Sequence, residues 1–330
     1  MAAVKVLQIL ASGPLTTLQD LGRTGYGAFG VPPSGAVDAF SLRIGNLLVG
    51  NPDHTAGLEI TLMGLRAKVL SEMVVAITGG DMQPLHNGRP LPMWEAVLLN
   101  PGDTLSFQVA KTGCRSYLTV GGGFEAPKIM GSAATNLSTG FGGLDGRALK
   151  KGDLLASHSP HTHLGCAGNR LHRAMVPVYA DNWRLRVIWG PQEPDFPQAT
   201  KTRFLKDVFT VTSESDRTGI RLKGPLLPAK EGLPTSIISE GVVPGAIQVP
   251  GSGQPIILLG ETVTGGYRKI ATVISADLPW LGQIRPDHGV KFEAVTLSEA
   301  QKALQKREDT LSRLREQIGS HPICTQGTTP

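Results

Sequence analysis

Residues 239–277 read SEGVVPGAIQVPGSGQPIILLGETVTGGYRKIATVISAD, and the rest of the chain follows the pattern of this stretch. Three short apolar runs lie in it, at residues 246–249, 256–259 and 270–274, each rich in β-branched residues and bounded by Gly or Pro. Such runs are typical of β-strands joined by tight turns. Polar residues stand at the strand ends: Glu240, Gln248, Glu261, Thr264, Tyr267 and Lys269. Strands that end in glycine turns can aim such groups at a ligand, although ordinary hairpin turns facing water explain them equally well.

The first half of the chain shows the same strand pattern around one helix. After a first strand at residues 4–10, the apolar spacing of residues 34–49 predicts a helix that begins near Ser34 or Asp38 and ends at residues 50–52. Turn signals such as Asn87-Gly88 and Thr112-Gly113 separate the strands that follow. We expect these strands at residues 58–62, 66–70, 74–78, 95–99, 104–109 and 116–120. Short strands at this spacing indicate an antiparallel barrel or sandwich.

The second half repeats features of the first. Arg23-Thr24-Gly25 recurs as Arg217-Thr218-Gly219, and the pair Glu59 and Gly64 recurs at the same spacing as Glu240 and Gly245. Repeated positions at a near-constant offset indicate a duplicated fold. We therefore predict a mainly β protein with an N-terminal barrel at residues 1–156, a linker at 157–183 and a C-terminal barrel at 184–297.

The last part of the chain has a helical pattern. Residues 298–320 are charged, with apolar side chains on one stripe, and Ser298 with Gln301 matches a capping box. This pattern predicts a C-terminal helix that docks on its own domain or on a partner subunit. Residues 321–330 are expected to be a disordered tail.

The composition excludes several classes of protein. The formal charge of +5 is modest, and no Lys/Arg run or nucleic-acid-binding motif occurs. No apolar run approaches the roughly 18 residues of a membrane span, so we expect a soluble, cytoplasmic protein. Three histidines lie close together in the linker, at His158, His161 and His163, but no carboxylate or thiolate is placed to complete a metal shell. No metal site is expected.

Several motifs identify the chain as similar to one bacterial family. The carboxyltransferase-like proteins, also called allophanate hydrolase subunit 2, include KipA, the C subunit of the ATP-dependent 5-oxoprolinase and the carboxyltransferase region of urea carboxylase. The resemblance runs from about residue 5 to residue 300. It rests on Gln248-Val249-Pro250, Gly253-Gln254-Pro255-Ile256, Thr264-Gly265-Gly266-Tyr267, Ser34-Gly35-Ala36-Val37-Asp38, Arg115-Ser116-Tyr117-Leu118 and Met130-Gly131-Ser132.

The resemblance implies two duplicated cyclophilin-like β-barrel domains and three functions. The first is the C subunit of a 5-oxoprolinase that opens the lactam of 5-oxoproline to glutamate with a KipI-like and a LamB/YcsF-like subunit. The alternative is the carboxyltransferase component of a biotin-dependent urea or amide carboxylase. The second alternative is a KipA-like regulator that binds a KipI-like kinase inhibitor. The sequence contains neither a P-loop nor a biotinylation motif. We therefore expect ATP to be used by the assembly and biotin, in the alternative function, to be carried on another chain. The chain alone is expected to be inactive.

An amide or lactam substrate requires two kinds of group. Its carbonyl oxygen becomes more negative and needs fixed donors, such as the Lys269 ammonium or the backbone N–H groups of Gly265 and Gly266. Its N–H must lose a proton to a carboxylate, for which Glu240, Glu261 and Asp81 are candidates. Each candidate also has a structural explanation: Lys269 could be a solvated charge at a strand end, and Asp81 could be a turn residue. For Glu59 and Glu240, which occupy matching positions in the two halves, bonding of backbone N–H groups is favoured over catalysis.

These considerations predict a cleft between the two domains. The candidate catalytic residues are Lys269, Glu261, Asp81 and Tyr267. The candidate substrate-binding residues are Gln248, Thr264, Gly265, Gly266, Ser34, Gly35, Asp38, Arg23 and Glu240.

Overall fold

The computed structural model describes residues 3–319, and its contacts divide the chain into two compact units. Of the described residues, unit 1 contains 3–23, 34–179 and 310–319, and unit 2 contains 24–33 and 180–309. In unit 1 the segment expected as a linker, up to Tyr179, is part of the folded body. The helices among the described residues are all too short or too polar to span a bilayer.

Unit 1 contains two antiparallel sheets. The six-stranded sheet has the order β11-β1-β4-β9-β6-β7, and the five-stranded sheet has the order β2-β3-β10-β5-β8. The strands of the first sheet are β1 (Val4–Ser12), β4 (Leu65–Val69), β6 (Leu85–His86), β7 (Arg89–Pro90), β9 (Thr104–Ser106) and β11 (Leu154–Ser157). Those of the second are β2 (Leu15–Gln19), β3 (Gly57–Thr61), β5 (Met73–Asp81), β8 (Ala96–Leu99) and β10 (Thr112–Val120). Each strand expected between residues 58 and 120 has a counterpart here, with shifted ends.

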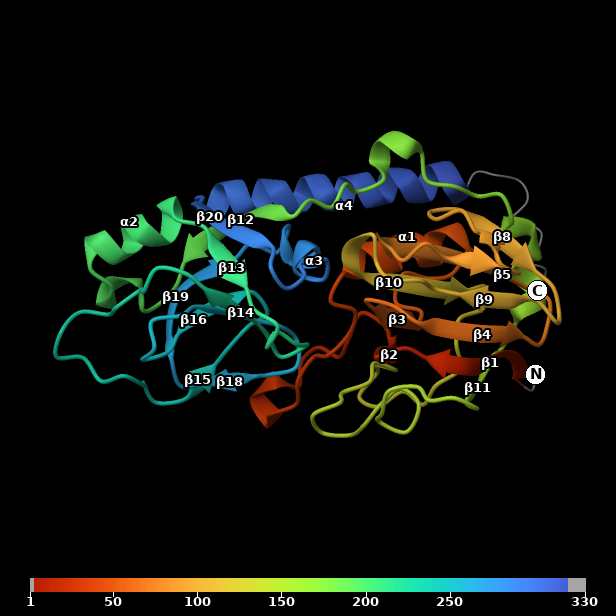
Figure 1. The fold of residues 1–330 in the computed structure, drawn as a ribbon, viewed down its shortest axis with the longest axis horizontal. Coiled ribbons are helices and arrows are strands. Elements are labelled where there is room, and N and C mark those ends of the chain that lie inside the picture. Colours follow the sequence, from red (N-terminus) through yellow and green to blue (C-terminus); the bar gives the residue numbers. More distant parts are fainter. Residues whose placement is uncertain (1–2, 320–330) are drawn as a thin grey trace. The chain divides into compact units, whose positions relative to one another are not determined.

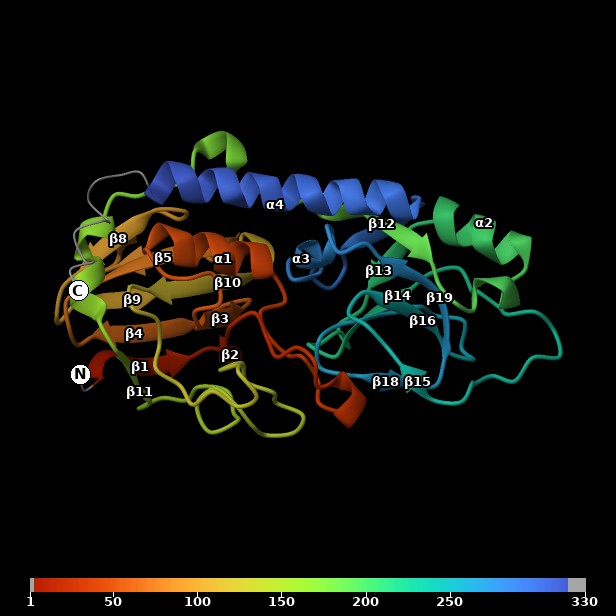
Figure 2. The same ribbon diagram turned by 180° about the vertical axis from the view of Figure 1, so that it is seen from behind.

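Strand β5 is buried on both faces because its two sets of side chains enter two different cores. Met73, Val75 and Ile77 lie in the core between the sheets, whereas Val74 and Ala76 lie in a second cluster. Helix α1 (Ala39–Leu48) and the end of α4 (Leu297–Gly319) supply other members of that cluster. Figures 1 and 2 show α1 covering the outer face of the five-stranded sheet.

Helix α1 begins where the apolar spacing predicted. The side chain of Asp38 is its N-cap and accepts a hydrogen bond from the Ser41 backbone N–H at 3.0 Å and another from the Ser41 hydroxyl at 2.6 Å. A capping carboxylate satisfies an otherwise unpaired N–H group in the first turn. Asp38 is thereby fixed at the start of the helix.

Residues 157–179 carry two 3-10 turns, η2 (Pro160–Cys166) and η3 (Arg173–Met175), which pack within unit 1. Cys166 and Leu171 are buried in the same apolar cluster as α1. This burial holds the segment against unit 1, so it is not a free linker. His163 Nδ1 lies 2.8 Å from the Val49 carbonyl oxygen. Across residues 3–319 no group of three His, Cys, Asp or Glu side chains could hold a metal ion.

Unit 2 contains a closed barrel with the strand order β12-β19-β16-β17-β14-β13-β20. Strands β12 and β20 pair in parallel and the other neighbours are antiparallel. The barrel strands are β12 (Asn182–Trp189), β13 (Phe209–Val211), β14 (Gly219–Lys223), β16 (Ala246–Val249), β17 (Ile256–Leu258), β19 (Arg268–Val273) and β20 (Gly289–Ala294). The shorter elements are η1 (Gly27–Phe29), η4 (Glu193–Asp195), α2 (Gln198–Lys206), α3 (Leu278–Leu281) and the hairpin strands β15 (Glu240–Gly241) and β18 (Thr264–Gly265). The predicted mainly β fold is confirmed.

Aromatic side chains hold α2 on the barrel. Phe204 of α2 stacks on Phe292 of β20 with the ring centroids 4.4 Å apart, and both rings contact Phe209 of β13. Aromatic pairs at this separation contribute beyond their buried area.

Helix α4 has a different N-cap from the one predicted. Thr296 and Glu299 bond each other reciprocally, with the Thr296 N–H donating to the Glu299 carboxylate at 2.7 Å and the Glu299 N–H donating to the Thr296 hydroxyl at 3.2 Å. The prediction of Ser298 and Gln301 was wrong by two residues, because the sequence contains two overlapping matches and the helix begins at Leu297.

Replacement of Thr296 by alanine is expected to lower the free energy of unfolding by about 1 kcal/mol, because the first turn loses its cap. Ser298→Ala is the matched control and should change it by less than about 0.5 kcal/mol. Urea denaturation of both variants measures the difference. Equal effects of the two substitutions would contradict the assignment.

Candidate functional site

A buried lysine ion pair stands at the centre of the predicted site in unit 2. Lys269 lies on β19 with its side chain 6% exposed, and its ammonium group is ion-paired with the Oε1 atom of Glu240 on β15. The alternative of a solvated Lys269 is wrong, because the barrel buries this side chain and Glu240 compensates its charge. The hydrogen bond from Lys269, followed by that from Gln192, holds the pKa of Glu240 below its usual value.

Gln192 is a member of this cluster that the sequence did not reveal. Its Nε2 donates to Glu240 Oε1 at 2.7 Å, and its Oε1 accepts from the backbone N–H of Lys269 at 3.1 Å. Gln192 therefore fixes both partners of the ion pair. A single polar residue beside a proline carries no pattern that would single it out, so only the fold could identify it.

The glycine turn at residues 264–267 packs on Gln248. Gln248 pairs with Lys269 across β16 and β19, and Glu240 pairs with Gly265 across the β15–β18 hairpin. A Cβ on Gly265 would lie 2.1 Å from the Gln248 amide nitrogen, so a larger residue there would displace the amide. The structure thus brings Lys269, Glu240, Gln248 and Gly265 together within one unit.

The other three residues of the predicted glycine turn have different environments. Thr264 is exposed on the hairpin and Gly266 is partly buried. The Tyr267 side chain borders a separate pocket of about 650 Å³ that Arg221 and Lys223 also line.

Glu261, proposed from sequence as a catalytic carboxylate, is the ion-pair partner of Arg217. Its Oε1 accepts hydrogen bonds from Arg217 Nη2 at 3.0 Å and from Nε at 3.2 Å, and both side chains are almost completely buried. The pair anchors the start of β14 to the end of β17. The Glu261 carboxylate is therefore already engaged by a buried guanidinium.

In unit 1 the predicted binding loop at residues 34–38 is tied to its surroundings. The Ser34 hydroxyl accepts a hydrogen bond from the Asn136 amide at 2.9 Å. Gly35 has φ +86°, and a Cβ there would lie 2.7 Å from the Gly22 nitrogen, so the position requires glycine. Arg23 donates to the Ala134 carbonyl at 2.6 Å. The Asn136 hydrogen bond and the close approach of Gly35 to Gly22 hold the loop in place.

A buried polar network supports the same loop. The Tyr117 hydroxyl donates to Glu59 Oε2 at 2.7 Å and accepts from the Asp38 backbone N–H at 2.8 Å, while the Val37 N–H donates to the same Glu59 oxygen at 2.9 Å. Burial, with the charge of Glu59 next, raises the pKa of Tyr117 well above its usual value. The prediction that Glu59 bonds backbone N–H groups is correct, but for Glu240 it is wrong, because that carboxylate bonds the side chains of Lys269 and Gln192.

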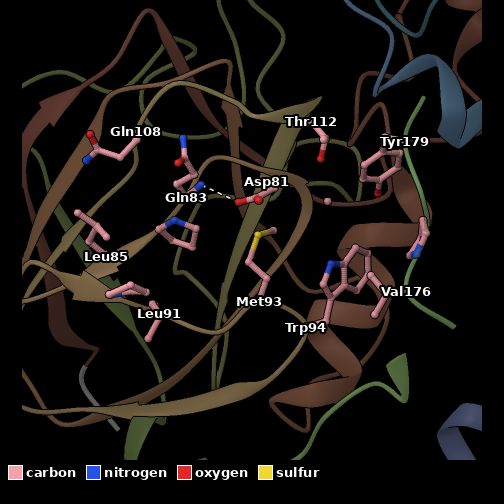
Figure 3. A pocket seen from close by; sticks show the side chains of 14 residues that line it. Asp81, Gln83, Leu85, Leu91, Met93, Trp94, Gln108, Thr112, Val176 and Tyr179 are labelled. Carbon is pink, nitrogen blue, oxygen red and sulfur yellow. Dashed lines mark hydrogen bonds between the residues drawn. The ribbon is translucent and has the colours of Figure 1, made fainter. Parts of the chain in front are cut away.

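Asp81, at the end of β5, lies in a pocket of about 590 Å³ within unit 1 (Figure 3). Its Oδ1 accepts a hydrogen bond from the Gln83 backbone N–H at 2.8 Å. The other lining residues are Gly79, Pro84, Leu85, Pro90, Leu91, Met93, Trp94, Gln108, Thr112, Val176, Pro177 and Tyr179. The volume falls in the range of small-molecule sites, about 300–1,000 Å³.

The sequence of this two-unit chain matches that of a carboxyltransferase domain. The family model described as carboxyltransferase domain, subdomain A and B, matches residues 29–294, and the chain belongs to this family. The chain is 36% identical over 317 residues to the 5-oxoprolinase C subunit of Escherichia coli (strain K12), and the match covers 94% of this chain and 97% of that protein. The resemblance seen in the motifs is confirmed.

The chain is also similar to part of much larger urea enzymes. It is 33% identical over 318 residues to urea amidolyase of Saccharomyces cerevisiae, covering 92% of this chain and 17% of that protein. The crystal structure of the K. lactis urea amidolyase matches 95% of this chain and 20% of its own with a TM-score of 0.88 and 29% sequence identity. The chain therefore spans about a fifth of these enzymes.

Proposed function

We propose that the chain is a subunit of an ATP-dependent 5-oxoprolinase, which hydrolyses the lactam of 5-oxoproline to glutamate. The observation that supports this function is the match to the 5-oxoprolinase C subunit over nearly the whole length of both chains. Because the sequence contains no P-loop, the proposal assigns ATP binding to another chain. A KipI-like and a LamB/YcsF-like subunit complete the proposed assembly, and the chain alone has little or no activity.

In this proposal Lys269 stabilises the lactam oxygen as it becomes negative. Its ammonium is held by Glu240 and its backbone by Gln192, so it needs no reorganisation before it acts. The Gln248 amide and the backbone N–H groups of the glycine turn orient the substrate amide. Glu240 is a poor proton acceptor at neutral pH because its pKa is lowered, and its role is to hold Lys269.

The close structural match to the K. lactis urea amidolyase favours a second candidate. As a carboxyltransferase component, the chain would transfer a carboxyl group from carboxybiotin to the nitrogen of urea or another amide. The biotin would be attached to another protein.

Reconstitution distinguishes these functions. The chain is purified alone and together with the two partner subunits, and ATP-dependent conversion of 5-oxoproline to glutamate is measured. We expect turnover only in the complete assembly; robust turnover by the single chain contradicts this. Carboxylation of urea by carboxybiotin without lactam hydrolysis supports the second candidate. Tight binding of the KipI-like chain with neither activity supports a KipA-like regulator.

A further inference from the structure

The pocket at Asp81 has an unusual distribution of charge. Among its 14 described lining residues, Asp81 carries the one carboxylate, and no Lys, Arg or His is present. The Asp81 Oδ2 atom and the Thr112 hydroxyl have no hydrogen-bond partner among residues 3–319. Both oxygens can therefore accept hydrogen bonds from a ligand.

The rest of the pocket is apolar and aromatic. Figure 3 shows Gln83 and Gln108 on one side of Asp81, and Trp94 and Tyr179 on the other. Burial raises the pKa of Tyr179 well above its usual value, so its ring carries a neutral hydroxyl. Aromatic rings attract cations through their electron-rich faces.

Backbone strain is also present at this pocket. Trp94 has φ +60° and Gln83 has φ +46°, in the left-handed region that bulky residues rarely adopt. The Trp94 backbone is held there by hydrogen bonds from its N–H to the Ile77 carbonyl at 2.7 Å and from the Leu171 N–H to its carbonyl at 2.9 Å. Strain that the surroundings maintain is concentrated at binding sites.

We propose that this pocket binds a cationic group on an apolar stem, namely an alkylguanidinium or alkylammonium group. The cation pairs with the Asp81 carboxylate and the Thr112 hydroxyl, while the stem contacts Met93, Trp94 and Tyr179.

The same charge distribution disfavours an anionic ligand. The carboxylate of 5-oxoproline is attached to the carbon next to the lactam nitrogen, so an N–H bonded to Asp81 would place two negative charges close together. Like charges in a partly buried site repel strongly. The ligand of this pocket is therefore not the lactam, and Asp81 is not the proton acceptor of that reaction.

Two sources of the cation share this chemistry, a small amine or guanidine and the Lys or Arg side chain of a peptide. Butylguanidinium and butylammonium represent the first source, and Nα-acetyl-arginine amide represents the second. Pentanoate and pentanamide are the anionic and neutral controls of similar size. Binding of each probe to the isolated full chain is measured by ligand-observed NMR titration.

We expect the cationic probes to bind and pentanoate not to bind. Asp81→Asn should weaken cation binding about tenfold, because a charge-assisted hydrogen bond is lost. The asparagine Oδ1 can still accept from Gln83, so the turn is retained. Asp145→Asn removes the same charge from a side chain that is 75% exposed and outside the pocket, and should leave binding unchanged.

Binding of butylguanidinium alone identifies a small-molecule site, and binding of the capped arginine identifies a site for a peptide side chain. The proposal is overturned if neither cation binds, if pentanoate or pentanamide binds equally well, or if Asp81→Asn has no larger effect than Asp145→Asn.

Discussion

Replacing Lys269 by methionine is expected to lower kcat of the assembled 5-oxoprolinase by about 10²-fold or more, because the fixed donor for the developing negative charge is lost. The loss should appear mainly in kcat, since the interaction strengthens only as charge develops on the lactam oxygen. Methionine has a similar length and no charge, so it can fill the space that the lysine side chain occupies. The measurement is steady-state production of glutamate by the complete assembly.

The fold should survive this substitution because Glu240, which loses its partner, is 44% exposed and can be solvated. Lys291→Met is the matched control, since Lys291 is an exposed lysine on barrel strand β20. Circular dichroism and co-purification with the partner subunits should be unchanged for both variants. A Lys269→Met assembly with normal kcat and KM would remove Lys269 from the mechanism.

Replacing Arg217 by methionine is expected to lower the free energy of unfolding by about 3–5 kcal/mol, because the buried Glu261 carboxylate loses the guanidinium that compensates it. The expected loss is larger than for a surface ion pair, since both side chains of this pair are almost completely buried. Urea denaturation of the purified chain measures the change.

The double variant Arg217→Met with Glu261→Met should recover most of this stability, because apolar side chains replace both charges. Arg221→Met is the matched control, since Arg221 is an exposed arginine on β14, the strand that follows Arg217. A loss for Arg217→Met no greater than for the control would show that the ion pair does not stabilise the barrel.

The elements of the fold follow closely from local sequence. The β-branched runs at residues 246–249, 256–259 and 270–274 form the barrel strands at 246–249, 256–258 and 268–273, because these side chains pack well on a pleated surface. The helix at residues 39–48 follows from its apolar spacing and from Asp38. The N-cap of α4 was predicted two residues too late, because Thr296 with Glu299 and Ser298 with Gln301 fit the same pattern and only the helix start distinguishes them.

The candidate site depends on contacts between segments that are distant in sequence, so it was harder to predict than the elements of the fold. The sequence pointed to Lys269 and Gln248, but the burial of Lys269 depends on Glu240, which is 29 residues away. The contribution of Gln192, which lies 77 residues before Lys269, had no local signal. Glu261 matched the chemistry of a base, and its pairing with Arg217 became visible only when the strands were placed. The predicted cleft between the domains stays a prediction.

The position of helix α4 at the end of the sequence has a consequence for folding during translation. Leu311, Leu314 and Ile318 complete the cluster that covers Ile44 and the outer side of β5, although the ribosome synthesises them after the entire barrel of unit 2. Until this part of the helix emerges, the nascent unit 1 presents an uncovered apolar surface, which is the kind of surface that chaperones recognise and that promotes aggregation. Premature termination anywhere before Leu311 therefore affects the unit that was translated first.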